Sequence, residues 1–200
     1  MKKILSILLA VVLTLSLSSI VFADGGTWKQ DANGWWYQNE DGSYPEDEWQ
    51  YIDDAWYYFE EFGYMFSGGW LSLGDEWYLF DKTGAMITGW QEVNGETYYF
   101  DESGAMITGW LQDGVNWYFF YTTGAMAKGW VLVGNLWYYL YENGVMATGK
   151  VTIDGEEYSF APTGELLDAS LAPINRVYPE IPAIPKPGVS TLIREMYVQQ

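Results

Sequence analysis

The 200-residue sequence contains neither cysteine nor histidine. Without cysteine there are no disulfide cross-links or thiol nucleophiles, and without histidine there are no histidine-assisted nucleophiles; Cys/His zinc sites are excluded as well. Basic residues are also scarce, because 9 Lys and Arg stand against 27 Asp and Glu, for a formal net charge of −18. This excess of acid argues against nucleic acid or an anionic membrane as a partner. We predict no cofactor and no metal site.

Aromatic residues are abundant instead. The chain has 12 Trp, 17 Tyr and 9 Phe, or 19% of all residues, which is more than a core of this size requires. The excess indicates stacking surfaces, and the acidity has a simple interpretation as the charge that keeps such a surface soluble.

Residues 1–23 are typical of a signal peptide. Lys2 and Lys3 precede an apolar run over residues 4–17, and Val21-Phe22-Ala23 places small residues at positions −3 and −1 of a cleavage site. An uncleaved anchor over residues 4–22 is the alternative, since this length nearly spans a bilayer. Either interpretation predicts export. Cleavage removes two lysines and no acid, which leaves 7 basic and 27 acidic residues, a charge of −20.

A repeat of about 20 residues organises the rest of the chain, and residues 69–88 are a clear copy: GWLSLGDEWYLFDKTGAMIT. The seventh copy begins at Lys150 and has Glu157 in the second Trp position, as expected of a terminal repeat that caps a stack. The leading tryptophans of the other copies are separated by 21, 21, 20, 20 and 20 residues; they are Trp28, Trp49, Trp70, Trp90, Trp110 and Trp130.

Each copy predicts a β-hairpin. In one copy, residues 110–112 form the first strand, Asp113-Gly114 a tight turn and residues 116–121 an aromatic second strand. One hairpin cannot fold alone, but stacked copies can bury a continuous core. The predicted fold is therefore an all-β solenoid of stacked β-hairpins over residues 24–167, with six Trp-led copies and a divergent capping copy. Residues 168–188, with five of the seven prolines, predict an extended spacer, and residues 189–200 a short segment of unknown role.

The aromatic positions suggest a ligand cage. Because side chains alternate along a strand, Trp130 and Trp137 can form two walls, Tyr158 of the next copy a third, and Met146 the floor. Two or three rings around a gap suit a quaternary ammonium group, at roughly 0.5–2 kcal/mol per ring. The alternative is that the rings are only core. That interpretation fits the phenylalanines of the second strands best: Phe59, Phe80, Phe100, Phe120 and Phe160.

The pattern GW-xxxx-G-x-WYY-F-xxx-G-x-M-x-T resembles the choline-binding (cell-wall-binding) repeat of Gram-positive surface proteins and autolysins, over residues 28–167. The resemblance implies a left-handed solenoid of hairpins. It also implies a secreted, cell-wall-associated protein that binds choline on teichoic and lipoteichoic acids between consecutive hairpins. Carried over by position, the implied choline-binding residues are Trp28, Trp35, Tyr57, Trp49, Trp56, Tyr78, Trp70, Trp77, Tyr98, Trp110, Trp117, Tyr138, Trp130, Trp137, Tyr158, Met65, Met86, Met126 and Met146.

Two copies depart from the pattern. Thr97 replaces the second Trp after Trp90, so we expect the Trp90–Tyr118 site to be weak or absent. Lys150 and Glu157 leave the last copy without an aromatic pair of its own.

Two other functions are compatible with parts of this pattern. Glycan binding is the main alternative, because rings also stack on sugar faces, although the acids and amides beside the rings vary from copy to copy. Catalysis by a carboxylate pair is not expected, because 27 acids cluster by chance and most lie in turns. We therefore predict a bare, non-enzymatic wall-binding module that acts alone or with a separate protein. The acid pairs considered were Glu46 or Glu48 with Asp53 or Asp54, and Glu60 with Glu61.

The predicted cleavage site can be checked directly. Because Val21-Phe22-Ala23 fits the cleavage pattern, the exported protein should begin at Asp24. Intact-mass spectrometry of protein from the culture medium measures this, and a secreted chain that retains residues 1–23 would contradict it.

Overall fold

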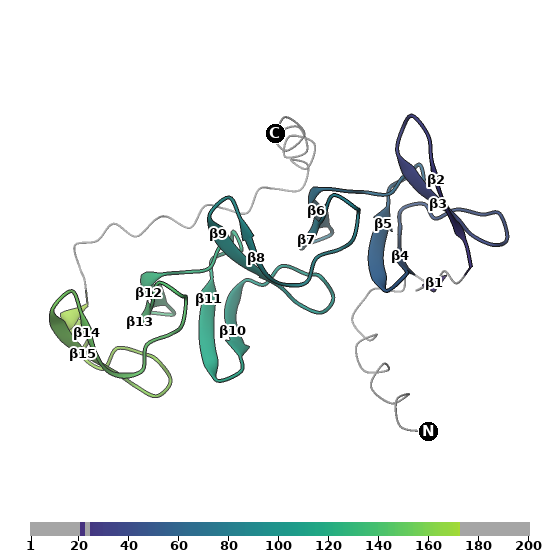
Figure 1. Cartoon of the computed structure of the whole chain (residues 1–200). Coiled ribbons are helices and arrows are strands. Elements are labelled where there is room, and N and C mark those ends of the chain that lie inside the picture. Colours follow the sequence, from purple (N-terminus) through teal and green to yellow (C-terminus); the bar gives the residue numbers. More distant parts are fainter. Residues whose placement is uncertain (1–20, 23–24, 173–200) are drawn as a thin grey trace, which may run out of the picture. The chain divides into compact units, whose positions relative to one another are not determined.

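The computed structural model describes residues 21–22 and 25–172, so the predicted segment 189–200, most of the signal peptide and nearly all of the spacer lie outside it. Within these residues the protein consists of short β-strands, turns and one 3-10 helix, η1 (Ala169–Leu171), with no α-helix (Figure 1). The prediction of an all-β fold of repeated hairpins is confirmed. Among the described residues no helix has the length and apolar character needed to cross a membrane.

Every predicted copy forms a two-stranded antiparallel hairpin. β1 (Val21–Phe22), which lies in the predicted signal peptide, pairs with β4 in parallel. The hairpins are β2 (Thr27–Gln30) with β3 (Trp35–Gln38), β4 (Glu48–Ile52) with β5 (Ala55–Phe59), β6 (Gly69–Leu73) with β7 (Glu76–Phe80), β8 (Gly89–Val93) with β9 (Glu96–Phe100), β10 (Gly109–Asp113) with β11 (Asn116–Phe120), β12 (Gly129–Val133) with β13 (Leu136–Leu140), and β14 (Gly149–Ile153) with β15 (Glu156–Phe160).

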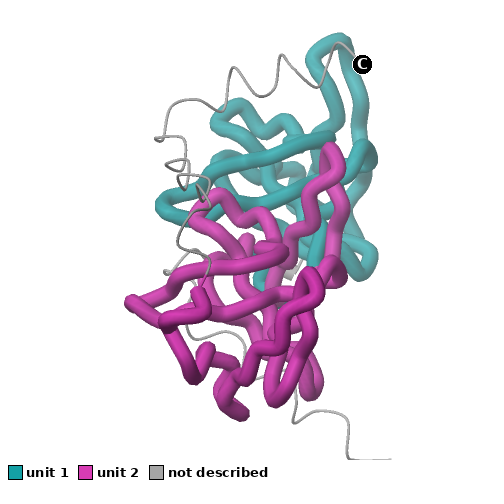
Figure 2. The backbone as a smooth tube through the Cα atoms, turned by 90° about the vertical axis from the view of Figure 1, so that its left-hand side faces the viewer, with its two compact units in different colours: residues 1–88, 102–105, 187–200 teal, residues 89–101, 106–186 magenta. Residues whose placement is uncertain are grey.

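The chain divides into two compact units, coloured separately in Figure 2. Unit 1 comprises residues 1–88, 102–105 and 187–200, and it contains hairpins β2–β3, β4–β5 and β6–β7. Unit 2 comprises residues 89–101 and 106–186, and it contains the four hairpins from β8–β9 to β14–β15.

Two-residue turns close the hairpins from β4–β5 to β14–β15, whereas the four residues 31–34 connect β2 to β3. Asn94 and Gly95 both have positive φ, 54° and 82°, as the mirror-image turns of hairpins require. The predicted Asp113-Gly114 turn is displaced by one residue, because Asp113 pairs with Asn116 as the last residue of β10. The turn is Gly114-Val115, with Gly114 at φ 62°. Glycine thus occupies the first turn position, where it takes positive φ without strain.

The two faces of each hairpin meet different neighbours. Cross-strand pairing sets Trp130 opposite Tyr139 and Leu132 opposite Trp137, so both tryptophans lie on one face. Tyr138 lies on the other face, where its ring is 4.8 Å from Trp110 of the preceding hairpin. Consecutive hairpins of a unit therefore stack with the tryptophan face of one against the tyrosine face of the next.

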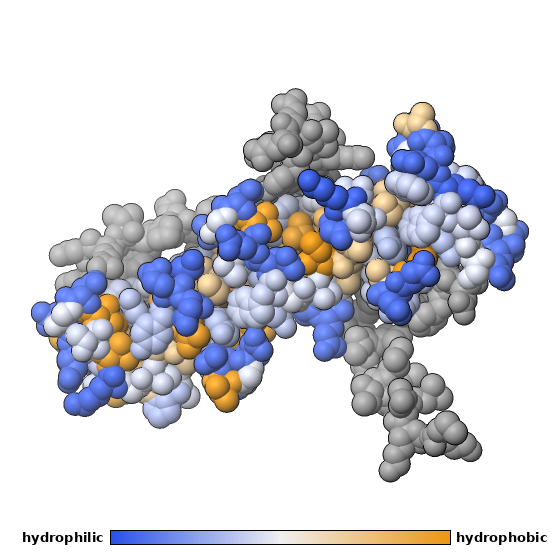
Figure 3. All heavy atoms as spheres, in the orientation of Figure 1, coloured by the Kyte–Doolittle hydropathy of each residue, from blue (hydrophilic) through white to orange (hydrophobic). Residues whose placement is uncertain are grey.

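The core runs between these stacked faces. The phenylalanines that end the second strands, Phe59, Phe80, Phe100, Phe120 and Phe160, are all buried, which confirms their predicted role; Leu140 fills the same position in its copy. In the face drawn in Figure 3, hydrophilic residues cover many of the loops, with small separate apolar patches between them, one of which lies at the tip of β10–β11, where Val115 is exposed.

The loop after each hairpin adds a second link between copies. Met126 forms a bridge with Phe120 of its own hairpin, and its amide donates to the Thr97 carbonyl of the preceding hairpin at 2.8 Å. Gly144 of the next loop packs on Met126, so closely that an added Cβ would overlap the methionine sulfur.

A pair of glycine substitutions separates packing from backbone strain. Gly114 and Gly144 both have positive φ, 62° and 80°, but nothing lies within 4 Å of a Cβ built on Gly114. We expect Gly114→Ala to lower the free energy of unfolding by about 1–2 kcal/mol through the left-handed backbone alone. Gly144→Ala should lower it by a further 1–3 kcal/mol or so, because Met126 is overpacked. Urea denaturation followed by tryptophan fluorescence measures both, and equal losses would contradict the packing argument.

Candidate functional site

The candidate sites are repeated sets of four side chains drawn from two hairpins and one loop. Trp110 and Trp117 come from one hairpin, with ring centroids 6.4 Å apart and planes at 80°. Tyr138 of the next hairpin lies 4.8 Å from Trp110. Met146, from the loop after that hairpin, packs in the same cluster, and its amide donates to the Trp117 carbonyl at 2.8 Å.

Three further sets lie wholly within one unit and share this arrangement. The leading Trp is 4.9–5.0 Å from the Tyr of the next hairpin in each of them. The ring centroids of Trp49 and Trp56 are 6.5 Å apart, and their planes cross at 85°. Those of Trp130 and Trp137 are also 6.5 Å apart, with planes at 83°. These sets are Trp28, Trp35, Tyr57 and Met65; Trp49, Trp56, Tyr78 and Met86; and Trp130, Trp137, Tyr158 and Leu166.

The structure changes the expected partner of one methionine. Met146 lies in the Trp110 set and not, as expected, below Trp130 and Trp137. Leu166 takes that position, since its amide donates to the Trp137 carbonyl at 2.8 Å. The reason is spacing along the stack: the loop that reaches back to a hairpin follows the next hairpin, one full copy later.

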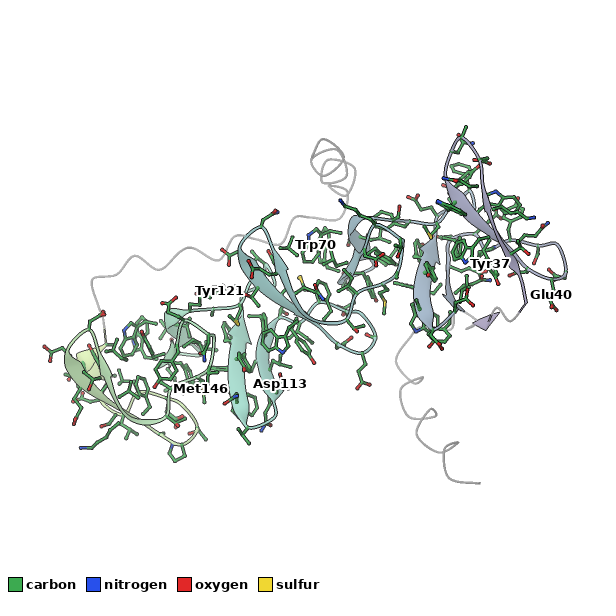
Figure 4. The ribbon with its side chains drawn as sticks, in the orientation of Figure 1. Tyr37, Glu40, Trp70, Asp113, Tyr121 and Met146 are labelled. Carbon is green, nitrogen blue, oxygen red and sulfur yellow. The ribbon has the colours of Figure 1, made fainter. Side chains whose placement is uncertain are left out.

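Two methionines need a further comment. Met126, which was predicted to bind ligand, reaches back to the Trp90 set, in which Thr97 stands in place of the second Trp. Met106 was left out of the prediction, yet its bridge to Phe100 matches that of Met126 to Phe120. The Gly-Ala-Met motif at residues 104–106 carried this signal in the sequence. The labelled Met146 in Figure 4 shows how such a side chain lies beside the aromatic rings.

The predicted set of Trp70, Trp77 and Tyr98 is divided between the units, because the tryptophans belong to unit 1 and the tyrosine to unit 2. It stays a prediction from the sequence.

The two tryptophans of a set have different surroundings. The leading Trp packs on the phenylalanine of the next hairpin, as Trp49 stacks on Phe80 at 5.6 Å, and Trp130 is only 6% exposed. Of the second tryptophans, Trp35 and Trp117 are 44% and 39% exposed, whereas Trp56 and Trp137 are partly buried and Trp137 packs against a core cluster. The core interpretation therefore leaves the exposure of Trp35 and Trp117 unexplained.

An open cavity of about 470 Å³ accompanies the first set. Its walls are Trp28, Trp35, Tyr57 and Met65, together with Lys82 and Thr83 from the turn after β7. This volume falls within the range of small-molecule sites. The walls combine the polarisable surface of aromatic rings and a thioether with the polar groups of Tyr57, Lys82 and Thr83.

Charged groups near the tyrosines favour a cation in these sets. The pKa of Tyr57 is raised by burial and by the nearby carboxylates of Asp81 and Asp53. The pKa of Tyr138 is raised by burial and by Glu165. Both rings therefore stay neutral at ordinary pH, and acidic groups lie near two of the four sets.

The Trp90 set keeps the backbone of the others but lacks one wall. Trp90 is 4.7 Å from Tyr118, and the Thr97 carbonyl accepts from Met126 at 2.8 Å, as the carbonyls of the second tryptophans do elsewhere. Thr97 offers no ring, and the Trp90 Nε1 donates to Asp113 Oδ2 at 2.9 Å. Asp113 is labelled in Figure 4. The position of Thr97 thus has the same backbone hydrogen bond as the second tryptophans and differs from them by the missing ring.

The last copy carries an ion pair where the others carry tryptophans. Lys150 Nζ lies 3.3 Å from Glu157 Oε1, and both side chains are largely exposed.

The carboxylates of β4–β5 are arranged poorly for glycosidase chemistry. Glu48 begins β4, whereas Asp53 and Asp54 form the turn at the other end of the same hairpin. At about 3.3 Å per strand residue their backbones are some 16 Å apart, beyond the roughly 5–9.5 Å of catalytic carboxylate pairs.

Two families of sequence repeats match the chain. The choline-binding repeat matches residues 87–128 and 127–169. The cell wall binding repeat matches residues 47–65 and 68–86. Together these matches span the hairpins from β4–β5 to β14–β15.

Several solved structures and a curated protein are similar to this chain. CbpJ from Streptococcus pneumoniae TIGR4 is 35% identical, with a TM-score of 0.66 over 70% of this chain and 51% of that one. Choline-binding protein F from the same species, solved with a peptidoglycan analogue, is 41% identical with a TM-score of 0.64, over 70% and 46% of the two chains. The lysozyme of Streptococcus phage Cp-9 is 65% identical over 65 residues, 32% of this chain and 19% of that protein. The chain thus spans about half the length of its structural relatives and a fifth of the phage lysozyme.

The different burial of Trp117 and Phe120 should appear as different losses of unfolding free energy when each is replaced by alanine. Phe120 is 1% exposed, and we expect Phe120→Ala to cost about 3–5 kcal/mol of unfolding free energy. Trp117 is 39% exposed, so Trp117→Ala should cost only about 1–2 kcal/mol. Urea denaturation of the two variants tests this, and comparable losses would show that Trp117 is a core residue.

Proposed function

The chain belongs to the choline-binding repeat family, and we propose that it attaches an exported protein to the cell wall by binding choline groups of teichoic or lipoteichoic acid. The observation that carries this proposal is the repeated set of two tryptophans, one tyrosine and one methionine or leucine, in which the second Trp is exposed at Trp35 and Trp117.

The chemistry of the sets matches that of a quaternary ammonium group. Its charge is diffuse and it donates no hydrogen bond, so it loses little when water is removed and gains from the negative faces of neutral rings. Trp110, Trp117 and Tyr138 present such faces at two nearly perpendicular orientations. The methionine or leucine adds an apolar floor that makes no hydrogen-bond demand.

Several weak sites on one chain suit a polymeric ligand. A single cage of this kind should reach only about millimolar affinity after the costs of binding. Four complete sets lie within the two units, and each can hold one choline of the same polymer. Simultaneous engagement raises the overall affinity without any new contact.

Glycan binding is less well supported than choline binding. Sugars need hydrogen-bond partners in a fixed position beside the stacking ring, whereas the polar residues beside these sets change from copy to copy. We also infer that this chain binds rather than catalyses, although the curated relatives are lysozymes, because the chain matches only 19% of the Cp-9 protein.

Restoring the missing ring tests the proposed sites. The backbone of Thr97 already has the geometry of the second tryptophans, and its side chain is half-buried beside open solvent. We expect Thr97→Trp to add one choline site in isothermal titration calorimetry with choline chloride. The parent should be stabilised by choline, by roughly 2.7 kcal/mol at a hundredfold excess over Kd.

Glu157→Trp is the matched control. It adds the same side chain to the last copy, where Lys150 occupies the leading position, so no site can be completed there. A well-folded Thr97→Trp protein with unchanged choline stoichiometry would count against the site assignment. A parent that ignores choline and is retained on dextran would favour the glycan alternative.

A further inference from the structure

The first and last hairpins differ in the polarity of the face that has no neighbouring copy. In β14–β15 this face carries only polar side chains, because Lys150 pairs with Ser159 and Thr152 with Glu157 across the strands. The Lys150–Glu157 ion pair lies on it. A polar face is what a stack of repeats requires where it ends in solvent. The first hairpin, β2–β3, has no such face.

The outward face of β2–β3 resembles part of an aromatic set that lacks its preceding hairpin. Trp36 occupies the position that Tyr57 has in the second copy. In later hairpins the ring at this position lies 4.7–5.0 Å from the leading Trp of the hairpin before it. Among the described residues β2–β3 is the first hairpin, so Trp36 meets no such tryptophan. Its ring instead lies 6.1 Å from Tyr44, edge to face.

Tyr44 takes the place of a loop methionine. It lies two residues after Gly42, as Met65 lies two residues after Gly63. Gly63 also packs on Tyr44, where an added Cβ would be 2.7 Å from the ring, in the same way that Gly84 packs on Met65. The loop contact of the other copies is thus kept, but with an aromatic ring that is 51% exposed.

Phe62 brings a third ring to this region. It directly precedes Gly63, so it has the position of Thr83, which lines the cavity of the Trp28 set. Phe62 is 75% exposed. Trp36, Tyr44 and Phe62 therefore form an N-terminal aromatic surface at a place where a polar cap is expected. The other turns carry a polar residue at the position of Phe62: Asp41, Thr83, Ser103, Thr123, Asn143 and Thr163.

The N-terminal aromatic surface is flanked by charges of both signs. Lys29 pairs across the hairpin with Trp36, so it lies on the same face. Glu61 precedes Phe62 and has the position of Lys82, which lines the Trp28 cavity. Lys29 and Glu61 are both exposed, and within the described part of the chain neither forms an ion pair. A surface with both charges can be complementary to itself.

We propose that two copies of this chain form a twofold-symmetric dimer through their N-terminal aromatic surfaces. Trp36, Tyr44 and Phe62 of each copy are then removed from water, and each Lys29 faces the partner's Glu61. The polar face of β14–β15 offers no matching surface, so copies do not join first hairpin to last and association stops at two. This goes beyond wall binding, and it presents the aromatic sets of two chains to one polymer.

Sedimentation equilibrium of the exported protein, without choline, measures this association. We expect a monomer–dimer equilibrium with a dissociation constant of about 10–100 μM, as suits a small interface. A protein that is still monomeric at about 0.2 mM would overturn the inference, because such an equilibrium is then mostly dimer. Species larger than a dimer would overturn it as well, since they require a contact that does not close.

Two substitutions replace the exposed rings by residues that the chain itself has at the equivalent positions. Phe62→Thr introduces the residue type of Thr83, and Tyr44→Met that of Met65, so both proteins should keep the parent's fold and urea denaturation midpoint. Because each change occurs twice in a twofold interface, each should raise the dissociation constant about tenfold or more. Unchanged association of the well-folded double variant would refute the proposed surface.

Leu167→Thr is the matched control. Leu167 follows the last hairpin and is 66% exposed, so this variant removes a comparable apolar side chain outside the N-terminal aromatic surface. The dissociation constant should stay that of the parent. Loss of the dimer in this variant would place the contact at the last copy and overturn the inference.

An exchange of charges tests the twofold arrangement. Lys29→Glu and Glu61→Lys should each weaken the dimer about two- to fivefold, the effect of exposed ion pairs. The protein with both changes should regain the parent's dissociation constant, because the pairs are restored with their signs reversed. A combined variant that associates no better than the single ones would rule out this arrangement.

Discussion

The contact between the leading tryptophan of one hairpin and the tyrosine and phenylalanine of the next is the interaction on which the rest of the structure depends. A two-stranded hairpin has too little apolar surface to fold by itself. Trp49 buries additional apolar surface against the next hairpin, because its ring lies 5.0 Å from Tyr78 and stacks on Phe80 at 5.6 Å. The same ring pair is found at Trp130, with Tyr158 and Phe160 at 4.9 Å and 5.8 Å. Folding of each copy and formation of each ligand set therefore rely on the same neighbour.

The two tryptophans of a set differ in packing because of this contact. The leading ring is half core and half wall, so it is fixed in place before any ligand arrives. The second ring, as in Trp35 and Trp117, stands open on a strand whose backbone is held by a methionine amide from another copy. The β8–β9 hairpin, with Thr97 in the second position, accordingly forms with the same pairing as the others.

The acidic residues contribute differently from the aromatic rings. Acids near Tyr57 and Tyr138 favour a cation at the tyrosine walls and keep an aromatic surface soluble. Lys82 in one turn and Glu102 in the next are exposed and differ between copies, whereas Gly84 and Gly104 of the same turns pack on Met65 and Met86.

The sequence by itself determined the hairpins, the buried phenylalanines and the pairing of rings across copies. Its 20-residue period and strand alternation fix which side chains share a face, and both are local properties. The tertiary structure alone decided which methionine serves which set, because the loop of Met146 reaches back a full copy through its amide to Trp117. It also decided that the turn is Gly114-Val115, since pairing of Asp113 with Asn116 depends on the partner strand. Lys82 reaches the Trp28 cavity from a hairpin two copies away, a proximity that stacking creates and that no local pattern encodes.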